Sequence, residues 1–106
     1  MAQTNAAGGK THEAYFLSFS GYTLPLTPAD QVSKSEAEKQ RSYYRAEYDA
    51  DGRLTLLEKH LDGKVFFRHE YRYFAGGTIR EARVADQEGR LVIHTFNESG
   101  GRLETR

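Results

Sequence analysis

A glycine in a short polar stretch, followed by a strand-like run, recurs through residues 48–106. Successive glycines of this pattern are 11, 14, 12 and 12 residues apart. One hairpin turn plus one strand of about six to nine residues needs a spacing of this size. The pattern therefore predicts a series of antiparallel hairpins, whose marker glycines are Gly52, Gly63, Gly77, Gly89 and Gly101.

The predicted fold is mainly β: a twisted antiparallel β-meander of six to eight strands with one short helix near residues 28–41. A chain of 106 residues has the length of a single domain. The helix is predicted from Thr27-Pro28, with proline at a first helical position, and from Ser33 and Glu36, which have the spacing of a capping box. Its few apolar side chains favour a surface connector.

The N-terminal part of the chain divides into three segments. Residues 1–13 are small and polar, which predicts a disordered tail before a single β-meander domain of residues 14–106. Residues 14–19 are apolar at nearly every position, which predicts a well-buried strand. Residues 22–26 contain Pro25, which cannot donate to a sheet ladder, so an edge strand or an extended arm is expected there.

Two turns determine the predicted pairing of the central strands. Asp62-Gly63 is a strong signal for a two-residue hairpin, and residues 49–53 fit a longer turn with Gly52 in the left-handed region. Counting outward from each turn gives the expected cross-strand neighbours. They are Tyr48–Leu54 and Ala46–Leu56 around the first turn, and Leu61–Lys64, His60–Val65, Glu58–Phe67 and Leu56–His69 around the second.

Alternation of side chains along each strand then assigns them to two faces. The face expected to be apolar carries Leu54, Leu56, Val65, Phe67, Tyr71, Tyr73, Ile79, Leu91 and Ile93. The reverse face is expected to carry Arg45, Glu47, Lys59, Arg68, Glu70, Arg72 and Arg80. After Thr78 the same counting puts further apolar residues on the reverse side, so both faces are expected to be covered there, with the N-terminal strand as one cover; these residues are Ala82, Val84, Val92 and Phe96.

The composition argues against several classes of protein. Fifteen lysines and arginines balance 15 aspartates and glutamates, and the sequence pI is near 6.9, so nucleic-acid binding is not expected. The absence of cysteine excludes disulfides, thiolate metal sites and a cysteine nucleophile. No apolar run reaches the ~18 residues of a membrane span, and the first residues lack the features of a signal peptide. We therefore expect a cytoplasmic protein without a cofactor.

The segment from Tyr48 to Leu54, Tyr-Asp-Ala-Asp-Gly-Arg-Leu, resembles the YD-type repeats of Rhs proteins. Residues 89–91 and 101–103 keep the Gly-Arg-Leu end of that motif, and the later Gly-x-Leu steps are similar to MORN-variant repeats. The resemblance implies a hairpin fold, and relatives of such repeats occur in toxin shells and antitoxin-like proteins. The whole chain also looks like small uncharacterised bacterial single-domain proteins. None of these resemblances assigns a catalytic residue.

The candidate functional site follows from the predicted pairing. Glu58 and His60 are expected on one face, with His69 diagonal to Glu58 and with Glu81 and Arg83 beside them on the next strand. Two imidazoles and a carboxylate can bind a divalent metal or act as an acid–base pair. The same groups can instead satisfy one another as ion pairs at the rim of an apolar face. The pattern favours no particular metal.

Three functions are compatible with the sequence. The leading expectation is a non-catalytic protein-binding module or small homo-oligomer, joined to its partner through a sheet face or edge, because aromatic side chains are plentiful and no catalytic set is assembled. The alternative is a metal- or small-ligand-binding enzyme that uses the Glu/His cluster. A second alternative, from the resemblance alone, is an antitoxin or immunity-like partner of a toxin.

Overall fold

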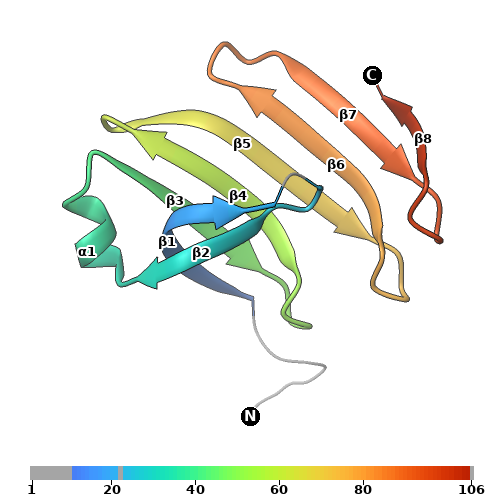
Figure 1. The fold of residues 1–106 in the computed structure, drawn as a ribbon, viewed down its shortest axis with the longest axis horizontal. Helices are drawn as coiled ribbons and strands as arrows, with labels where there is room; N and C mark the ends of the chain where they lie inside the picture. The colour runs from blue at the N-terminus through green and yellow to red at the C-terminus, as the bar shows by residue number, and fades with distance from the viewer. Residues whose placement is uncertain (1–10, 22, 106) are drawn as a thin grey trace.

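The computed structural model describes residues 11–21 and 23–105, which form a single sheet and one short helix. The eight strands lie in the order β2-β1-β3-β4-β5-β6-β7-β8, so β1 pairs with both β2 and β3, and from β3 to β8 each strand pairs with the next one in sequence (Figure 1). The predicted antiparallel meander with one short helix is thereby confirmed. The elements are β1 (His12–Ser20), β2 (Thr27–Val32), α1 (Lys34–Glu38), β3 (Ser42–Tyr48), β4 (Leu54–Leu61), β5 (Lys64–Tyr73), β6 (Ile79–Asp86), β7 (Leu91–Phe96) and β8 (Arg102–Thr105).

The helix begins at the second of its two predicted start signals. Ser33 Oγ accepts a hydrogen bond from the Glu36 N–H at 3.2 Å, as a capping serine should. The first signal, at Thr27-Pro28, is wrong, because these residues open the edge strand β2. A proline without an N–H is tolerated on an edge strand as well as in a first helical turn, so the dipeptide did not discriminate between them.

The N-terminal segments differ in their boundaries from the prediction. The predicted tail of residues 1–13 falls mostly outside the described residues, but β1 already begins at His12. The predicted buried strand of residues 14–19 lies within β1, where Ala14, Tyr15 and Phe16 are buried. In the predicted edge run, Tyr22 lies outside the described residues, and residues 23–26 form an irregular connection rather than a strand.

Four hairpin turns share one main-chain geometry. In each, the first residue donates its N–H to the carbonyl of the fifth, and the fourth donates to the carbonyl of the first, at 2.8–3.0 Å. The fourth residue is always a glycine with positive φ, a conformation that costs a residue with a Cβ atom steric strain. These turns are residues 49–53, 74–78, 86–90 and 97–101. The turn between β4 and β5 is the predicted two-residue hairpin, with φ of 51° at Asp62 and 80° at Gly63.

The predicted register holds beside the first turn and fails one residue further on. Tyr48 pairs with Leu54 as predicted, but Ala46 pairs with Leu57 rather than Leu56. Thr55 is an extra residue on β4, which makes a β-bulge. Counting in steps of one residue cannot anticipate an inserted residue, so the predicted faces are reversed beyond it.

A second bulge shifts the pairing of β4 with β5. The pairs beside Asp62-Gly63 are as predicted, but Phe66 is then an extra residue on β5. The predicted pairs Glu58–Phe67 and Leu56–His69 are therefore wrong by one residue. The observed pairs are Glu58–Arg68, Leu57–His69 and Leu56–Glu70.

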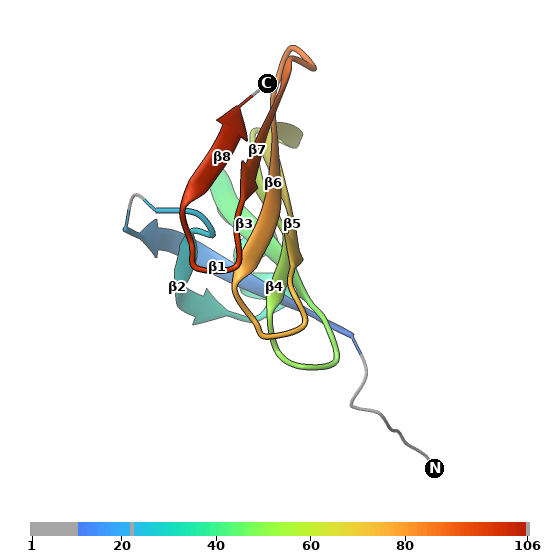
Figure 2. The same cartoon turned by 90° about the vertical axis from the view of Figure 1, so that its right-hand side faces the viewer.

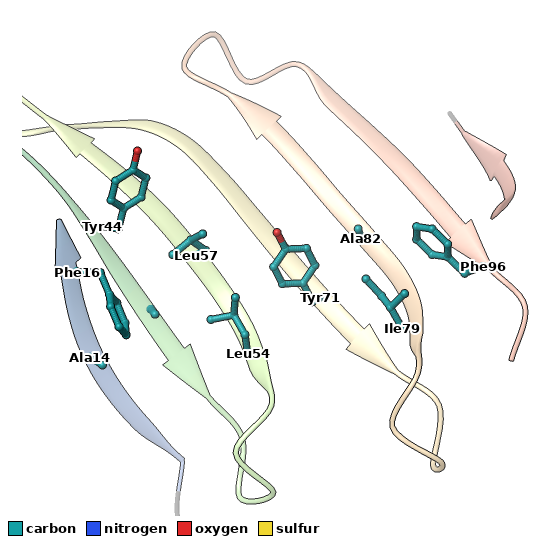
Figure 3. Packing of buried hydrophobic residues seen from close by; sticks show 10 residues of the cluster. Ala14, Phe16, Tyr44, Leu54, Leu57, Tyr71, Ile79, Ala82 and Phe96 are labelled. Carbon is teal, nitrogen blue, oxygen red and sulfur yellow. The ribbon is translucent and has the colours of Figure 1, made fainter. Parts of the chain in front are cut away.

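A third bulge, at Arg80 on β6, completes one continuous apolar face. Leu54 and Leu57 point to the same side although they are three residues apart, and so do Ile79 and Ala82 (Figure 3). Among the described residues, Leu57 is the largest side chain that is fully buried. The buried cluster consists of Ala14, Phe16, Tyr44, Ala46, Leu54, Leu57, Tyr71, Ile79, Ala82 and Phe96.

The bulges overturn several predicted face assignments. Ala82 and Phe96, predicted on the reverse side, belong to the core, and Lys59 lies on the core side with Nζ 5.8 Å from the centroid of the Tyr44 ring. Leu56 is buried on the reverse face instead, between two glutamates on the flanking strands. The pairing also moves Val65, Leu91 and Ile93 from the predicted apolar face to the reverse face.

The β1–β2 hairpin crosses over the apolar face instead of extending the plane of the sheet (Figures 1 and 2). Leu24 and Leu26, in the connection between the two strands, pack against the core cluster. The N-terminal strand pair is therefore a cover, on the core side. Its cover is partial, because Phe66 and Val92 on that side remain 37% and 38% exposed.

Replacing Leu57 with alanine should lower the free energy of unfolding by about 3 kcal/mol, because a fully buried leucine leaves a cavity that the sheet cannot close. Urea denaturation measures the change. The matched control is Leu91→Ala: Leu91 is 45% exposed, and its loss should cost less than about 1 kcal/mol. Equal losses for the two variants would contradict the assigned faces.

Candidate functional site

Glu58 and His69 are the two buried polar or charged residues within the described part of the chain, with 6% and 8% of their surface exposed. They come from the paired strands β4 and β5. Glu58 pairs with Arg68, the residue before His69, so the two buried groups project to opposite faces of the sheet. The sheet therefore carries two separate polar centres.

The Glu58 carboxylate on the reverse face is bound by side chains of β3, β4 and β5. Arg68 Nη1 donates to Oε2 at 2.8 Å, and Arg45 Nη1 donates to Oε1 at 3.2 Å. His60 Nε2 lies 3.1 Å from Oε1. Because Arg45 and Arg68 flank Glu58 in the ladder, direct cross-strand pairing brings both guanidiniums to this carboxylate.

Further carboxylates surround this centre. Arg45 also binds Glu47 and, with Nε, Glu13 Oε2 at 2.6 Å, and Arg68 Nη2 lies 3.3 Å from Glu70 Oε2. The hydrogen bond from Tyr15, and after it the one from Arg45, holds the pKa of Glu13 below its usual value. Every arginine of this network has more than one carboxylate partner, which makes the network a self-satisfied set of ion pairs.

The His60 ring has a second contact that fixes its orientation. It stacks on Tyr43 with ring centroids 4.8 Å apart and planes at 9°. Tyr43 in turn lies 6.0 Å from the Tyr15 ring. The imidazole is thus held between an aromatic face and the Glu58 carboxylate.

The His69 centre lies on the core side. Tyr71 Oη is 2.6 Å from His69 Nδ1 and accepts a hydrogen bond from the Leu26 N–H at 3.2 Å. The hydroxyl donates to Nδ1 in the tautomer with the imidazole proton on Nε2, and accepts from Nδ1 in the other tautomer. This chain of hydrogen bonds ties the cover to the centre of the sheet.

Burial controls the protonation of this centre. Desolvation, with a smaller contribution from His94, lowers the pKa of His69 to about 4. Burial raises the pKa of Tyr71 to about 12. Both groups are consequently neutral near pH 7.

The five residues of the predicted site do not converge. Glu58 and His60 are in contact, but His69 is on the other face. Arg83 pairs with Glu70, and its Nη1 lies 3.5 Å from Glu81 Oε2. Within residues 11–21 and 23–105, no group of three or more histidine, aspartate or glutamate side chains could hold a metal ion. Ligand binding by the five predicted residues stays a prediction.

Sequence reasoning missed the residues that give each centre its chemistry. Arg45 and Arg68 were expected on the reverse face, but Glu58 was expected on the other one, so their ion pairs were not anticipated. Alternating Arg and Glu on neighbouring strands was the available signal. No sequence signal marked Tyr71 as the partner of His69, because their spacing of two residues is common to every strand.

Replacing Glu58 with glutamine should lower the free energy of unfolding by about 2 kcal/mol, because two guanidiniums would lose a buried carboxylate. Urea denaturation at low and high salt provides the measurement. The control is Glu36→Gln, whose ion pair with Lys39 is exposed and should change stability by less than about 0.5 kcal/mol. A loss no larger than the control's would show that the network contributes nothing to stability.

Stability should fall as the pH falls from about 6.5 to 4, because the unfolded chain protonates His69 in this range while the folded protein keeps it neutral. A pKa depressed to about 4 from 6.5 corresponds to a loss of about 3 kcal/mol. Denaturation curves at several pH values measure the slope. His69→Gln, which keeps an acceptor for Tyr71, should flatten it, whereas His12→Gln, at an exposed position, should not. An unchanged slope in His69→Gln would refute the assignment.

Comparison with known proteins gives one match. Searches of curated proteins and of solved structures found none. No helix within the described residues is long and apolar enough to cross a membrane. A family model described as a family of unknown function (DUF6156) matches residues 9–105, nearly the whole chain. The chain therefore belongs to this family.

Proposed function

We propose that this chain is a non-catalytic binding module, which joins a protein partner or a second copy of itself through the uncovered part of its apolar face. The observation that carries the proposal is the partial cover of that face. The β1–β2 hairpin seals the core cluster around Tyr71, and it leaves Phe66 and Val92 more than one-third exposed on the same side. Phe66 and Val92 continue the apolar face beyond its cover, whereas the exposed Val65 and Leu91 lie on the charged reverse face.

The side chains around these two residues favour an apolar partner surface. Phe66 lies beside Lys59, whose ammonium is 5.3 Å from the centroid of the Phe66 ring. Phe19, in the hairpin that forms the cover, is 36% exposed and makes an edge contact with Tyr44. A partner could bury these rings without displacing a charged pair, and aromatic groups of this kind dominate binding energies in interfaces.

The absence of a converged set of reactive groups in the described structure supports the non-catalytic part of the proposal. On the reverse face, the Glu58 carboxylate is fully engaged by two guanidiniums and an imidazole. On the core side, the His69 imidazole is buried against Tyr71. Neither group is in a position to reach a substrate, because the hydrogen bonds that it makes to neighbouring side chains hold it in place.

The resemblance to YD-type and MORN-variant hairpin repeats stays a prediction. It is supported by the shared geometry of the turns at residues 49–53 and 86–90, in which Arg53 and Arg90 bind the first and third residues in the same way. An antitoxin-like role would be one form of the binding function proposed here, with a toxin as the partner.

A double variant, Phe66→Ser with Val92→Thr, should abolish the association because it removes the exposed apolar area without touching the buried cluster. Light scattering over a range of concentrations detects a homo-oligomer, and a pull-down with quantification of one co-purified protein detects a partner. Leu91→Ser is the control, since Leu91 is 45% exposed on the reverse face. A wild-type protein that stays monomeric and retains no partner would refute the proposal, and so would an association that the double variant keeps.

A further inference from the structure

In three of the four matching turns, a side-chain oxygen of the first residue occupies the same place, in front of two main-chain N–H groups of the turn. The Oδ1 atom of the first residue accepts hydrogen bonds from the N–H groups of the third and fifth residues. These two distances are 2.9 and 2.9 Å for Asp49, 2.9 and 3.0 Å for Asp86, and 3.0 and 2.9 Å for Asn97. The main chain of this turn thus presents two N–H groups to a single oxygen atom.

The fourth turn has the same main chain but no such oxygen. Residues 74–78 make the two defining main-chain hydrogen bonds, at 2.8 and 2.9 Å. The turn begins with Phe74, which has no side-chain acceptor. Within residues 11–21 and 23–105, no atom accepts a hydrogen bond from the N–H groups of Gly76 or Thr78. These are the third and fifth residues of the turn.

The turn is exposed at residues 75–78, and two arginines lie beside its first residue. A Cβ atom added at Gly76 or Gly77 would meet no atom within 4 Å. Arg53 Nη1 lies 3.4 Å from the Phe74 carbonyl oxygen, and Arg80 Cζ lies 5.9 Å from the centroid of the Phe74 ring. Arg53 is paired with Asp49 and Asp51, whereas Arg80 has no ion pair with any of the described residues. The guanidinium of Arg80 is therefore an uncompensated charge beside the turn.

We propose that the turn at residues 74–78 binds a carboxylate group, whose oxygen takes the place that Asp49, Asp86 and Asn97 fill in the other three turns. The N–H groups of Gly76 and Thr78 donate to it, and Arg80 supplies the attraction for its charge. The carboxylate belongs to an acidic side chain of a partner or to a small organic acid. This site lies at a turn of the sheet and does not depend on the proposed function of the apolar face.

A titration with sodium acetate at constant ionic strength, followed by amide chemical shifts in NMR, tests the proposal. The amides of Gly76 and Thr78 should shift in a saturable way. The equivalent amides in the other turns, Asp51 and Arg53 among them, should not, because an internal oxygen already occupies their site. Absence of a saturable shift at Gly76 and Thr78 would overturn the proposal.

Two variants of Phe74 distinguish the effect of supplying an internal oxygen from the effect of removing the aromatic ring. Phe74→Asn supplies the internal oxygen of the other turns and should abolish the response to acetate. Phe74→Leu removes the ring without supplying an oxygen and should keep the response. Arg80→Gln should weaken the apparent affinity several-fold. Equal binding by wild type and Phe74→Asn would show that acetate binds elsewhere.

A variant of another turn should create the same open site there, by removing the side-chain oxygen that now occupies it. Asn97→Ala removes the oxygen that accepts from Ser99 and Gly101, so these two amides should begin to respond to acetate. The affinity of a capped peptide with a single aspartate is compared with that of acetate. Tighter binding of the peptide indicates an acidic side chain of a partner, and tighter binding of acetate indicates a small organic acid. Tighter binding of inorganic phosphate than of both carboxylates would refute the assignment of the ligand class.

Discussion

The described structure depends on the burial of one apolar face of its single sheet. The buried cluster runs from β1 to β7, and the β1–β2 hairpin is the element that crosses over it. Burial of apolar surface is the dominant favourable term in folding. The strand pair at the edge of the sheet therefore stabilises the fold more by folding back over the core than it would by extending the plane of the sheet. The hydrogen bond between Leu26 and Tyr71 connects this cover to the sheet.

The β-bulges decide which side chains take part in that burial. Each inserts one residue into a strand, which brings residues three positions apart to the same side, as it does for Leu54 and Leu57. A bulge also increases the local twist and bends the strand. The bending is consistent with a sheet whose first strands curl over its face (Figure 2).

The same bulges separate the polar groups of the sheet into two kinds of environment. Glu58 lies on the reverse face, where two guanidiniums bind its carboxylate. His69, one position beyond Glu58's cross-strand partner, lies among aromatic rings, where burial keeps an imidazole neutral. A shift of one residue in pairing would exchange these environments and would leave an unpaired carboxylate in the core. Such a state would be strongly destabilised, which helps to fix the register.

The local sequence by itself determined the hairpins. Gly52, Gly63 and Gly89 adopt positive φ, and their turns are defined by contacts within five residues, so the meander and the pairs beside Gly52 and Gly63 could be predicted. The tertiary structure alone decided the positions of the bulges, the strand at Thr27-Pro28 and the separation of His69 from Glu58. These depend on packing between residues far apart in the chain. The alternation of side chains along a strand carries no information about where a bulge adds a residue. A bulge is stabilised only when apolar side chains from distant parts of the chain pack together on one face.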